Sequence, residues 1–290
     1  MSTLNRGKNA KLVPPPPWTL AIPETEYHGA AVRGDYMSSG MLREFRRCPA
    51  QYHGIVKGTA ARADSGAFRI GRAVHKLLLE GETPFRGAFT VGGPLNERTG
   101  RTFGPDTKAF SEWLRDNGLD KAGTLTSAEA DHVRRMRDAA KSHPEIGRLF
   151  SDGWAERSAR MTMEGVPCQI RIDWLRADGM AVDVKTVEDI TRFESDARRF
   201  GYLHQFAFYR DGALAAGGGE LEMTAVVLEK KPPYRAGVWT FPFATLEPYS
   251  IQNRQSLTAY RRCRETGRWP TGYESPRSFP PAGIPPVWLN

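Results

Sequence analysis

Alternating apolar and polar positions predict two neighbouring strands, over residues 166–176 and 180–186. Successive side chains of a strand point to opposite faces, so each strand should have one apolar face and one polar face. The expected faces are Ile170, Ile172 and Trp174 against Gln169, Arg171 and Asp173 in the first strand, and Val182 and Val184 against Ala181, Asp183 and Lys185 in the second.

A three-residue loop, Ala177-Asp178-Gly179, is expected to join these strands, with Gly179 in the left-handed conformation of a bulge. In that register Asp173 lies opposite Asp183, whereas a two-residue loop would put the two carboxylates on opposite faces. Directly opposed residues have Cβ atoms roughly 5 Å apart, and like charges there repel unless a cation lies between them. The register therefore makes a bound cation an attractive hypothesis.

Magnesium is the cation that this hairpin would suit. Asp173, Asp183 and the main-chain carbonyl of Val184 offer the oxygen ligands that Mg²⁺ prefers. Lys185 falls on the same face as Asp183, where it could orient an attacking water or stabilise charge on a phosphate. Taken alone, the hairpin leaves two interpretations equally open: metal-assisted phosphodiester cleavage, or an exposed hairpin with solvated charges.

Further periodic segments surround the hairpin and predict one α/β or α+β domain with an antiparallel-led sheet between helices. Residues 1–25, which include four consecutive prolines, are expected to form a mobile arm outside a single domain of residues 26–290. Residues 81–105 are expected to form a long loop, and the proline-rich tail from Trp269 to cross the surface. The expected helices are 39–48, 50–56, 67–80, 106–117, 126–142, 144–151, 190–199, 202–216 and 247–266, and the remaining strands are 154–163, 221–230 and 236–243.

Composition narrows the class of partner. The 290 residues can bury one substantial core, and 41 Lys and Arg against 33 Asp and Glu give a net charge of +8, which favours a polyanionic partner. Helix 126–142 displays basic residues that could contact a phosphate backbone or could simply be solvated. The sequence shows no apolar run of membrane-spanning length and no apolar signal core, so we expect a cytoplasmic protein without a membrane partner.

Several ordered motifs carry a family resemblance. The set Gly71-x-x-x-His75, Asp173, Asp183-Val-Lys185-Thr186 and Gln205-x-x-x-Tyr209 resembles the exonuclease branch of the PD-(D/E)xK nuclease superfamily. Segments 36–52, 71–80 and 265–273 are similar to the nuclease domain of exonuclease VIII, the RecE type, including its phage-borne relatives. This resemblance covers roughly residues 26 to 290.

The resemblance implies a restriction-endonuclease-like core, with a central mixed sheet that contains antiparallel hairpins and is flanked by helices. It also implies a Mg²⁺-dependent exonuclease, with Mn²⁺ expected to substitute, that degrades the 5′-ended strand of linear double-stranded DNA. The 3′ overhang would serve a RecT-like single-strand annealing protein in the bacterial host cell, and relatives assemble into homo-oligomeric rings. The alternatives are an endonuclease or flap nuclease of the same fold, or an inactive DNA-binding accessory protein.

The same resemblance assigns roles to individual residues. It implies that His75, Asp173 and Asp183 are metal ligands and that Lys185 is the catalytic lysine. Gln205 and Tyr209 match the helix motif after the metal strands; spaced four apart, they could hold a scissile phosphate or form a buried hydrogen-bonded pair. Glu156 falls where many relatives carry an acid on the neighbouring strand, and we expect either a metal contact or a surface salt bridge there.

Three further residues are candidates for DNA phosphate contacts. Ser39 lies at an expected helix start, where free NH groups favour an anion, although N-capping explains it equally well. Arg171 and Arg72 are the other two candidates.

The cysteines mark a departure from some superfamily members. Some PD-(D/E)xK nucleases hold an iron-sulfur cluster with one cysteine upstream and three near the C-terminus. Cys48 resembles the upstream member, but Cys263 alone follows downstream, and a cluster normally needs four thiolates. We therefore expect no iron-sulfur cluster.

Overall fold

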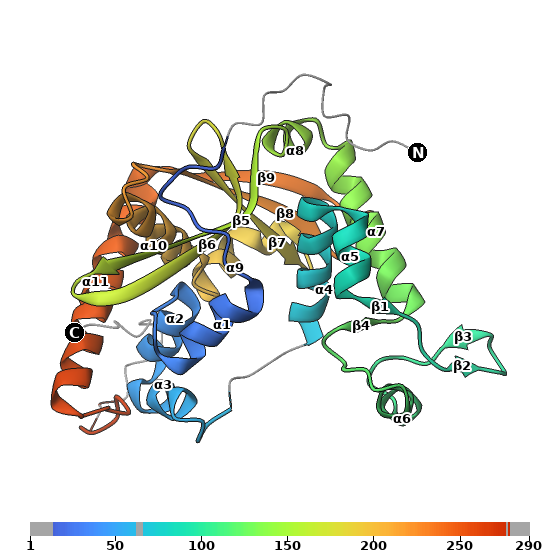
Figure 1. Cartoon of the computed structure of the whole chain (residues 1–290), viewed down its shortest axis with the longest axis horizontal. Coiled ribbons are helices and arrows are strands. Elements are labelled where there is room, and N and C mark those ends of the chain that lie inside the picture. The colour runs from blue at the N-terminus through green and yellow to red at the C-terminus, as the bar shows by residue number, and fades with distance from the viewer. Residues whose placement is uncertain (1–13, 62–65, 277, 279–290) are drawn as a thin grey trace.

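A five-stranded mixed sheet forms the centre of the molecule (Figure 1). The computed structural model describes residues 14–61, 66–276 and 278. Strand order follows the sequence, and all neighbouring pairs are antiparallel except β7 with β8. The strands are β5 (Gly153–Met163), β6 (Val166–Arg176), β7 (Met180–Val187), β8 (Glu222–Glu229) and β9 (Ala236–Phe241).

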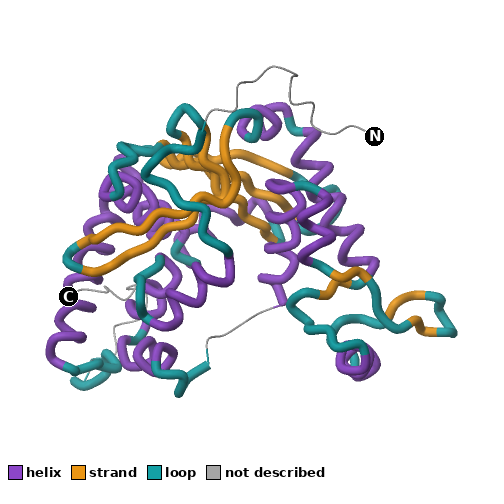
Figure 2. The backbone as a smooth tube through the Cα atoms, in the orientation of Figure 1, coloured by secondary structure: helices purple, strands orange, loops and turns teal. Residues whose placement is uncertain are grey.

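Helices cover both faces of this sheet and produce two hydrophobic clusters (Figure 2). The first cluster joins the sheet to α2 (Ser39–Arg47), α3 (Pro49–Val56), α10 (Tyr202–Ala215) and α11 (Phe243–Thr266). The second joins the opposite face to α4 (Gly66–His75), the π-helix η1 (Lys76–Glu80), α5 (Glu82–Ala88), α7 (Ser127–Ser142) and α8 (Pro144–Leu149). This arrangement confirms the expected α+β domain with a mixed sheet.

The remaining elements are small. A β2–β3 hairpin and α6 lie at the end of the molecule away from α11 in Figure 1. These elements are α1 (Glu24–Arg33), β1 (Thr90–Val91), β2 (Leu95–Asn96), β3 (Arg101–Thr102), α6 (Lys108–Asp116), β4 (Thr124–Leu125), η2 (Ile190–Arg192) and α9 (Phe193–Arg199).

The connection between β7 and β8 places one helix over the hairpin. Parallel neighbours need a crossover connection, and here η2, α9 and α10 provide it. Helix α10 packs on β5 and β6 and contacts α11. The polar residues of α10 therefore lie close to the β6–β7 hairpin.

The β6–β7 hairpin has the expected register. Trp174 pairs with Val182 and Leu175 with Ala181, and Gly179 has a φ of +89°. After those two pairs the strands separate, and Met37 pairs with Cys168 on the edge of β6 that β7 leaves free. The hairpin therefore opens into a fork beside Asp173.

One expected face is wrong. Ile170 and Ile172 belong to the first cluster, but Trp174 packs against the second, and Leu175 takes the first-cluster position. The cause lies on β5, where Glu156 has a φ of +54° and falls opposite Asp173 between the pairs Ala155–Trp174 and Arg157–Ile172. This left-handed residue interrupts the alternation of both strands.

Other expectations also change. Residues 81–105 contain α5, anchored by the buried Phe85, and α1 precedes the first expected helix. Part of the expected arm lies on the domain: Leu20 pairs with Ser158, and Trp18 packs against the first cluster. Residues 1–13 of that arm fall outside the described part of the chain. Within the described ranges, no helix is both long enough and apolar enough to span a membrane.

Candidate metal centre and active site

Asp173 lies where β6 and β7 separate. Its Oδ2 accepts a hydrogen bond of 2.8 Å from the main-chain N–H of Val184. The carboxylate thereby accepts the hydrogen bond that a main-chain carbonyl would accept if the two strands still paired at this point. The side chain is 13% exposed, so this oxygen reaches the floor of the fork rather than bulk solvent.

His75 reaches the same point from the opposite direction. Its Nε2 lies 2.8 Å from the carbonyl oxygen of Val184, so this nitrogen carries the proton and donates. In the neutral ring Nδ1 then holds a lone pair, 3.5 Å from Asp173 Oδ2. Two acceptors that face each other in this way are stabilised by a proton or a cation between them.

The end of α4 sets the position of His75. The helix changes from α to π geometry directly after this residue, a change often found at functional sites. One turn earlier, Gly71 faces β7, and an added Cβ there would make ordinary van der Waals contact with Thr186 Oγ1, at 3.6 Å. The Gly71-x-x-x-His75 spacing thus places one helix face along β7.

Glu156 completes a group of possible metal ligands. One ligand atom each from His75, Glu156 and Asp173 lies within 4.8 Å of the other two. The structure therefore places Glu156 beside His75 and Asp173, where the first of its two predicted roles, a metal contact, would need it. Its other contact is a salt bridge with Arg171, at 2.6 Å between Nε and Oε2.

The electrostatics of Asp173 reflect this crowding. The pKa of Asp173 is raised from 3.8 to about 7: burial is the largest cause, His75 opposes it, and the charges of Asp183 and Glu156 add to it. An acid in this position gains most from a nearby cation, because a cation compensates both the burial and the neighbouring negative charges.

Asp183 and Lys185 form a second group on the α10 side of β7. Lys185 Nζ lies 2.6 Å from Asp183 Oδ2 and donates to Gln205 Oε1 at 3.1 Å. The Gln205 amide nitrogen donates to Asp183 Oδ1 at 3.4 Å and to the Tyr209 hydroxyl at 2.8 Å. Because an ammonium can only donate, this network fixes the orientation of the Gln205 amide.

Neighbouring carboxylates keep Lys185 charged, and burial keeps Tyr209 neutral. Burial alone would lower the pKa of Lys185, but the carboxylates of Asp183 and Asp173 outweigh it and raise the pKa. Burial raises the pKa of Tyr209 well above its usual value. A charged lysine therefore lies in a buried site next to the fork.

Two aromatic residues that the sequence reasoning missed hold this lysine. The ammonium lies 4.8 Å from the ring centroid of Tyr202 and 5.7 Å from that of Phe206, both on α10. Tyr202 falls three residues before Gln205, and this i, i+3 spacing on one helix face is the signal that could have identified it.

The donors in this region fit a divalent metal ion. They are carboxylate and carbonyl oxygens with one imidazole, a set that suits Mg²⁺ or Mn²⁺. Asp183 Oδ2 is buried and lies 2.6 Å from the Lys185 ammonium, with which a metal ion would share this oxygen. One expectation changes: the compact ligand group contains Glu156 with Asp173, whereas Asp183 is compensated by Lys185.

The comparison with protein families identifies the domain. A family model described as a PDDEXK-like domain of unknown function (DUF3799) matches residues 38–276. The chain belongs to this family. Asp173 and the Asp183-Val184-Lys185 segment are the residues here that fit the acidic and D-x-K parts of the PDDEXK pattern.

The structural comparison agrees with the PDDEXK-like fold. A crystal structure of a protein from Eubacterium rectale, described as a putative exonuclease, superposes with a TM-score of 0.63. It is 14% identical in sequence, and the match covers 91% of this chain and 100% of that chain. No curated protein matches the sequence.

The three residues predicted to contact DNA phosphates lie in different surroundings. Ser39 is the first residue of α2, while Ser38 is the N-cap whose side chain accepts from Met41 N–H; both follow Met37, which pairs with Cys168 on β6. Arg72 is exposed and donates to the Ala122 carbonyl. Arg171 does not fit its predicted role, because Glu156 and the Ile22 carbonyl occupy its guanidinium and only 13% of the side chain is exposed.

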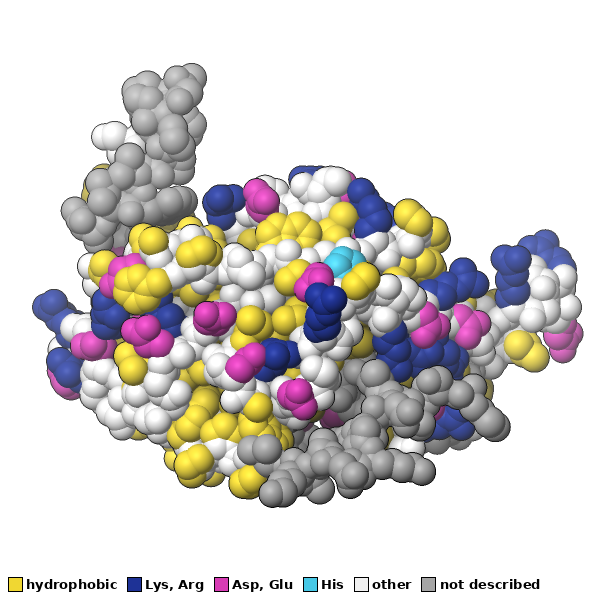
Figure 3. Space-filling model, turned by 90° about the horizontal axis from the view of Figure 1, so that it is seen from above, with side chains coloured by type: hydrophobic (Ala, Val, Ile, Leu, Met, Phe, Trp, Pro, Cys, Tyr) yellow, Lys and Arg dark blue, Asp and Glu magenta, His cyan; other side chains and the backbone are white. Residues whose placement is uncertain are grey.

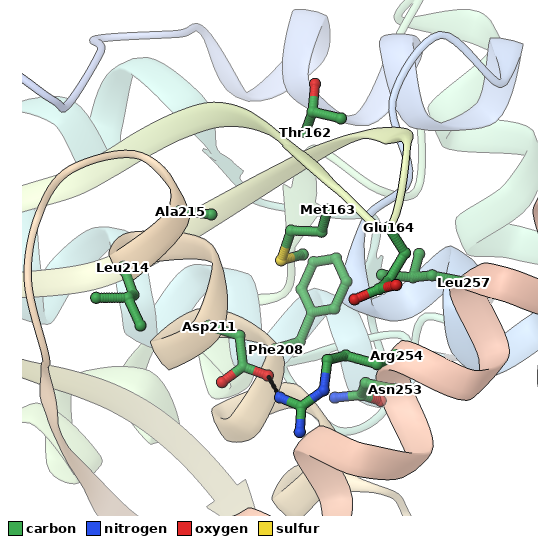
Figure 4. Close-up of a pocket in the computed structure, with 10 residues that line it drawn as sticks. All are labelled: Thr162, Met163, Glu164, Phe208, Asp211, Leu214, Ala215, Asn253, Arg254 and Leu257. Atoms are coloured by element: carbon green, nitrogen blue, oxygen red, sulfur yellow. Dashed lines mark ion pairs between the residues drawn. The ribbon is translucent and has the colours of Figure 1, made fainter.

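A separate cavity of about 330 Å³ lies where the turn between β5 and β6 meets α10 and α11 (Figure 4). Apolar side chains such as Met163, Phe208 and Leu257 line it, and Arg254 and Asp211 form an ion pair of 3.7 Å at its side. None of the metal-centre residues belongs to its lining.

Proposed function

We propose that this PDDEXK-like protein is a Mg²⁺-dependent exodeoxyribonuclease that acts on linear double-stranded DNA. The observation that carries the proposal is the arrangement around Val184. Its carbonyl contacts His75, its N–H contacts Asp173, and the flanking Asp183 and Lys185 form a buried ion pair. Structural hairpins have no need for three acids, a histidine and a lysine in one buried place.

His75 through Nδ1, Glu156 and Asp173, with Asp183 beside them, would hold the metal ion. The Val184 carbonyl, also predicted as a ligand, would orient the His75 ring by accepting from its Nε2–H. When bound, a divalent metal supplies Lewis-acid stabilisation of the phosphate and an activated water. Lys185 can donate to a phosphate oxygen or orient the water, because Gln205 and Asp183 hold its ammonium in one place. Gln205 in turn is held by the Tyr209 hydroxyl.

The finer features of the proposal rest on the RecE-type resemblance. These are degradation of the 5′-ended strand, a 3′ overhang for a RecT-like annealing protein, a homo-oligomeric ring, a role in recombination and a bacterial cytoplasmic location. The Eubacterium rectale protein is described as a putative exonuclease, which supports the choice of an exonuclease over an endonuclease. Replacement of Mg²⁺ by Mn²⁺ is expected because both ions accept this donor set.

A single assay tests the activity and its polarity. Linear duplexes labelled at either the 5′ or the 3′ end are incubated with the full-length protein while Mg²⁺ is titrated, and closed circular DNA is the matched substrate. We expect Mg²⁺-dependent release of the 5′ label from the linear duplex first, and intact circles.

Each other outcome has a defined meaning. Cleavage of circles would identify an endonuclease, early release of the 3′ label would reverse the polarity, and no Mg²⁺-dependent release would favour a DNA-binding accessory protein.

A further inference from the structure

Residues 18–22 lie along the outer edge of β5, and we call them the strap. Leu20 and Ser158 exchange two main-chain hydrogen bonds, of 2.7 and 3.0 Å. Arg157 donates to the Thr19 hydroxyl from Nε at 3.1 Å and from Nη2 at 3.0 Å. The strap therefore extends the sheet beyond its edge strand β5.

Arg171 joins the strap to the metal centre. Its Nη1 donates to the Ile22 carbonyl at 2.6 Å and to Ser158 Oγ at 3.3 Å, while its Nε donates to Glu156 Oε2 at 2.6 Å. A guanidinium is planar, so binding the strap at one nitrogen fixes the direction of the bond to Glu156 at another. One carboxylate has capacity for this bond and for a metal ion together.

The backbone of Glu156 shows why such a contact is needed. Its φ of +54° lies in the left-handed region that residues other than glycine rarely adopt. The other such residues in the described chain, Glu164 and Tyr234, lie outside the strands, whereas Glu156 lies within β5. A residue in this conformation persists where its surroundings hold it.

We propose that Arg171, anchored on the strap through the Ile22 carbonyl, is a positioning residue that holds Glu156 as a protein ligand of the divalent metal. This inference rests on the proposed function, since it requires that the His75–Glu156–Asp173 group binds metal. In this proposal the strap supports metal binding indirectly, through Arg171, and supplies no metal ligand of its own.

Manganese binding by the full-length protein tests this role without measuring activity. Free Mn²⁺ is followed by electron paramagnetic resonance for the wild type and for Arg171→Met, Glu156→Gln and the double variant. We expect each single variant to bind Mn²⁺ about 10-fold more weakly, as is typical when a residue that orients a ligand is lost. The double variant should be no weaker than Glu156→Gln alone, because both changes remove the same ligand.

Arg157→Met is the matched control, because Arg157 also binds the strap through the Thr19 hydroxyl but pairs with no acid in the described part of the chain. It should leave Mn²⁺ affinity unchanged even if it lowers the melting temperature. Arg171→Lys keeps the charge but cannot reproduce the fork, so it should fold and bind Mn²⁺ with intermediate affinity.

The inference is overturned if Arg171→Met binds Mn²⁺ as tightly as the wild type or more tightly, if Arg157→Met weakens binding equally, or if the losses of the double variant add. If Arg171→Met does not fold, wild-type affinity in Arg171→Lys has the same meaning. Absence of Mn²⁺ binding in the wild type would instead overturn the proposed function on which the inference rests.

Discussion

Lys185 is the residue in which burial and charge conflict most clearly. Its side chain is 14% exposed, and Asp183, Gln205 and two aromatic rings surround its ammonium. Desolvation disfavours the charged form, but the nearby carboxylates reverse the balance, so the pKa rises. The site thus keeps a rigid cation next to the fork.

Replacing Lys185 by methionine should slow DNA cleavage about 100- to 1000-fold, because a positioned charge that stabilises the reacting phosphate is lost. Duplex affinity should change little, since contacts along the backbone supply most of it. Lys231→Met is the control, because Lys231 is exposed and its ion-pair partner in the described part of the chain is Glu188, at 3.2 Å. Wild-type cleavage rates in a folded Lys185→Met protein would exclude a catalytic role.

At the scale of single residues, the sequence predicted which side chains lie close together. It did not predict that they form two separate groups. The motif order brings His75, Asp173, Asp183, Lys185 and Gln205 together, as the structure does. The two-group arrangement depends on Glu156, whose left-handed φ cannot be read from alternation. The same residue moved Trp174 to the other face.

Helix α10 is the element on which the second group depends, because it carries Tyr202, Gln205 and Tyr209. Its close approach to the sheet requires Gly212, where an added Cβ would meet Ile170 Cγ2 at 2.8 Å and Met161 Cε at 3.3 Å. Both of those side chains belong to the first cluster. Packing at this glycine therefore sets the distance between the helix motif and the metal strands.

Gly212→Ala should lower the free energy of unfolding by about 1 kcal/mol. Overpacking costs about 1 to 3 kcal/mol, and the higher helix propensity of alanine returns up to about 1 kcal/mol. Gly147→Ala in α8 is the control, since nothing lies within 4 Å of its added Cβ and only the propensity gain remains. Urea unfolding measures both; equal stabilisation by the two alanines would show that α10 can move away from the sheet.

Helices with strong periodicity were predicted close to their observed bounds, but α1 and α5 were not. Helix α5 has seven residues and one fully buried large side chain, Phe85, so it offers no repeating apolar face. Helix α1 buries two alanines besides Tyr27, and small residues give a weak periodic signal. Tertiary packing, which the local pattern does not contain, stabilises both.

At the scale of the whole molecule, the excess of basic residues is spread among acidic ones. On the face seen in Figure 3, Lys and Arg side chains alternate with Asp and Glu. Part of the predicted basic helix is compensated in this way, since Arg134 and Arg137 both contact Glu82. The net charge of +8 therefore favours a polyanion in general, and a DNA contact of the exposed Arg72 stays a prediction.

Arg72→Ala should reduce the salt dependence of duplex binding. If Arg72 neutralises one phosphate, the slope of log affinity against log salt concentration should become less negative by about 0.9. Arg148→Ala is the control, because Arg148 is 75% exposed and pairs with Glu145 at 2.8 Å. Fluorescence anisotropy with a linear duplex in Ca²⁺ gives the slopes; an unchanged slope for Arg72→Ala would remove it from the DNA contacts.

A crystal of the full-length protein soaked in Mn²⁺ tests most directly whether these residues form one metal centre. We predict an anomalous peak in contact with His75, Glu156 and Asp173, and its loss in Asp173→Asn. An empty fork in crystals that bind Mn²⁺ elsewhere, or an unchanged peak in Asp173→Asn, would contradict a metal-dependent active site at this place.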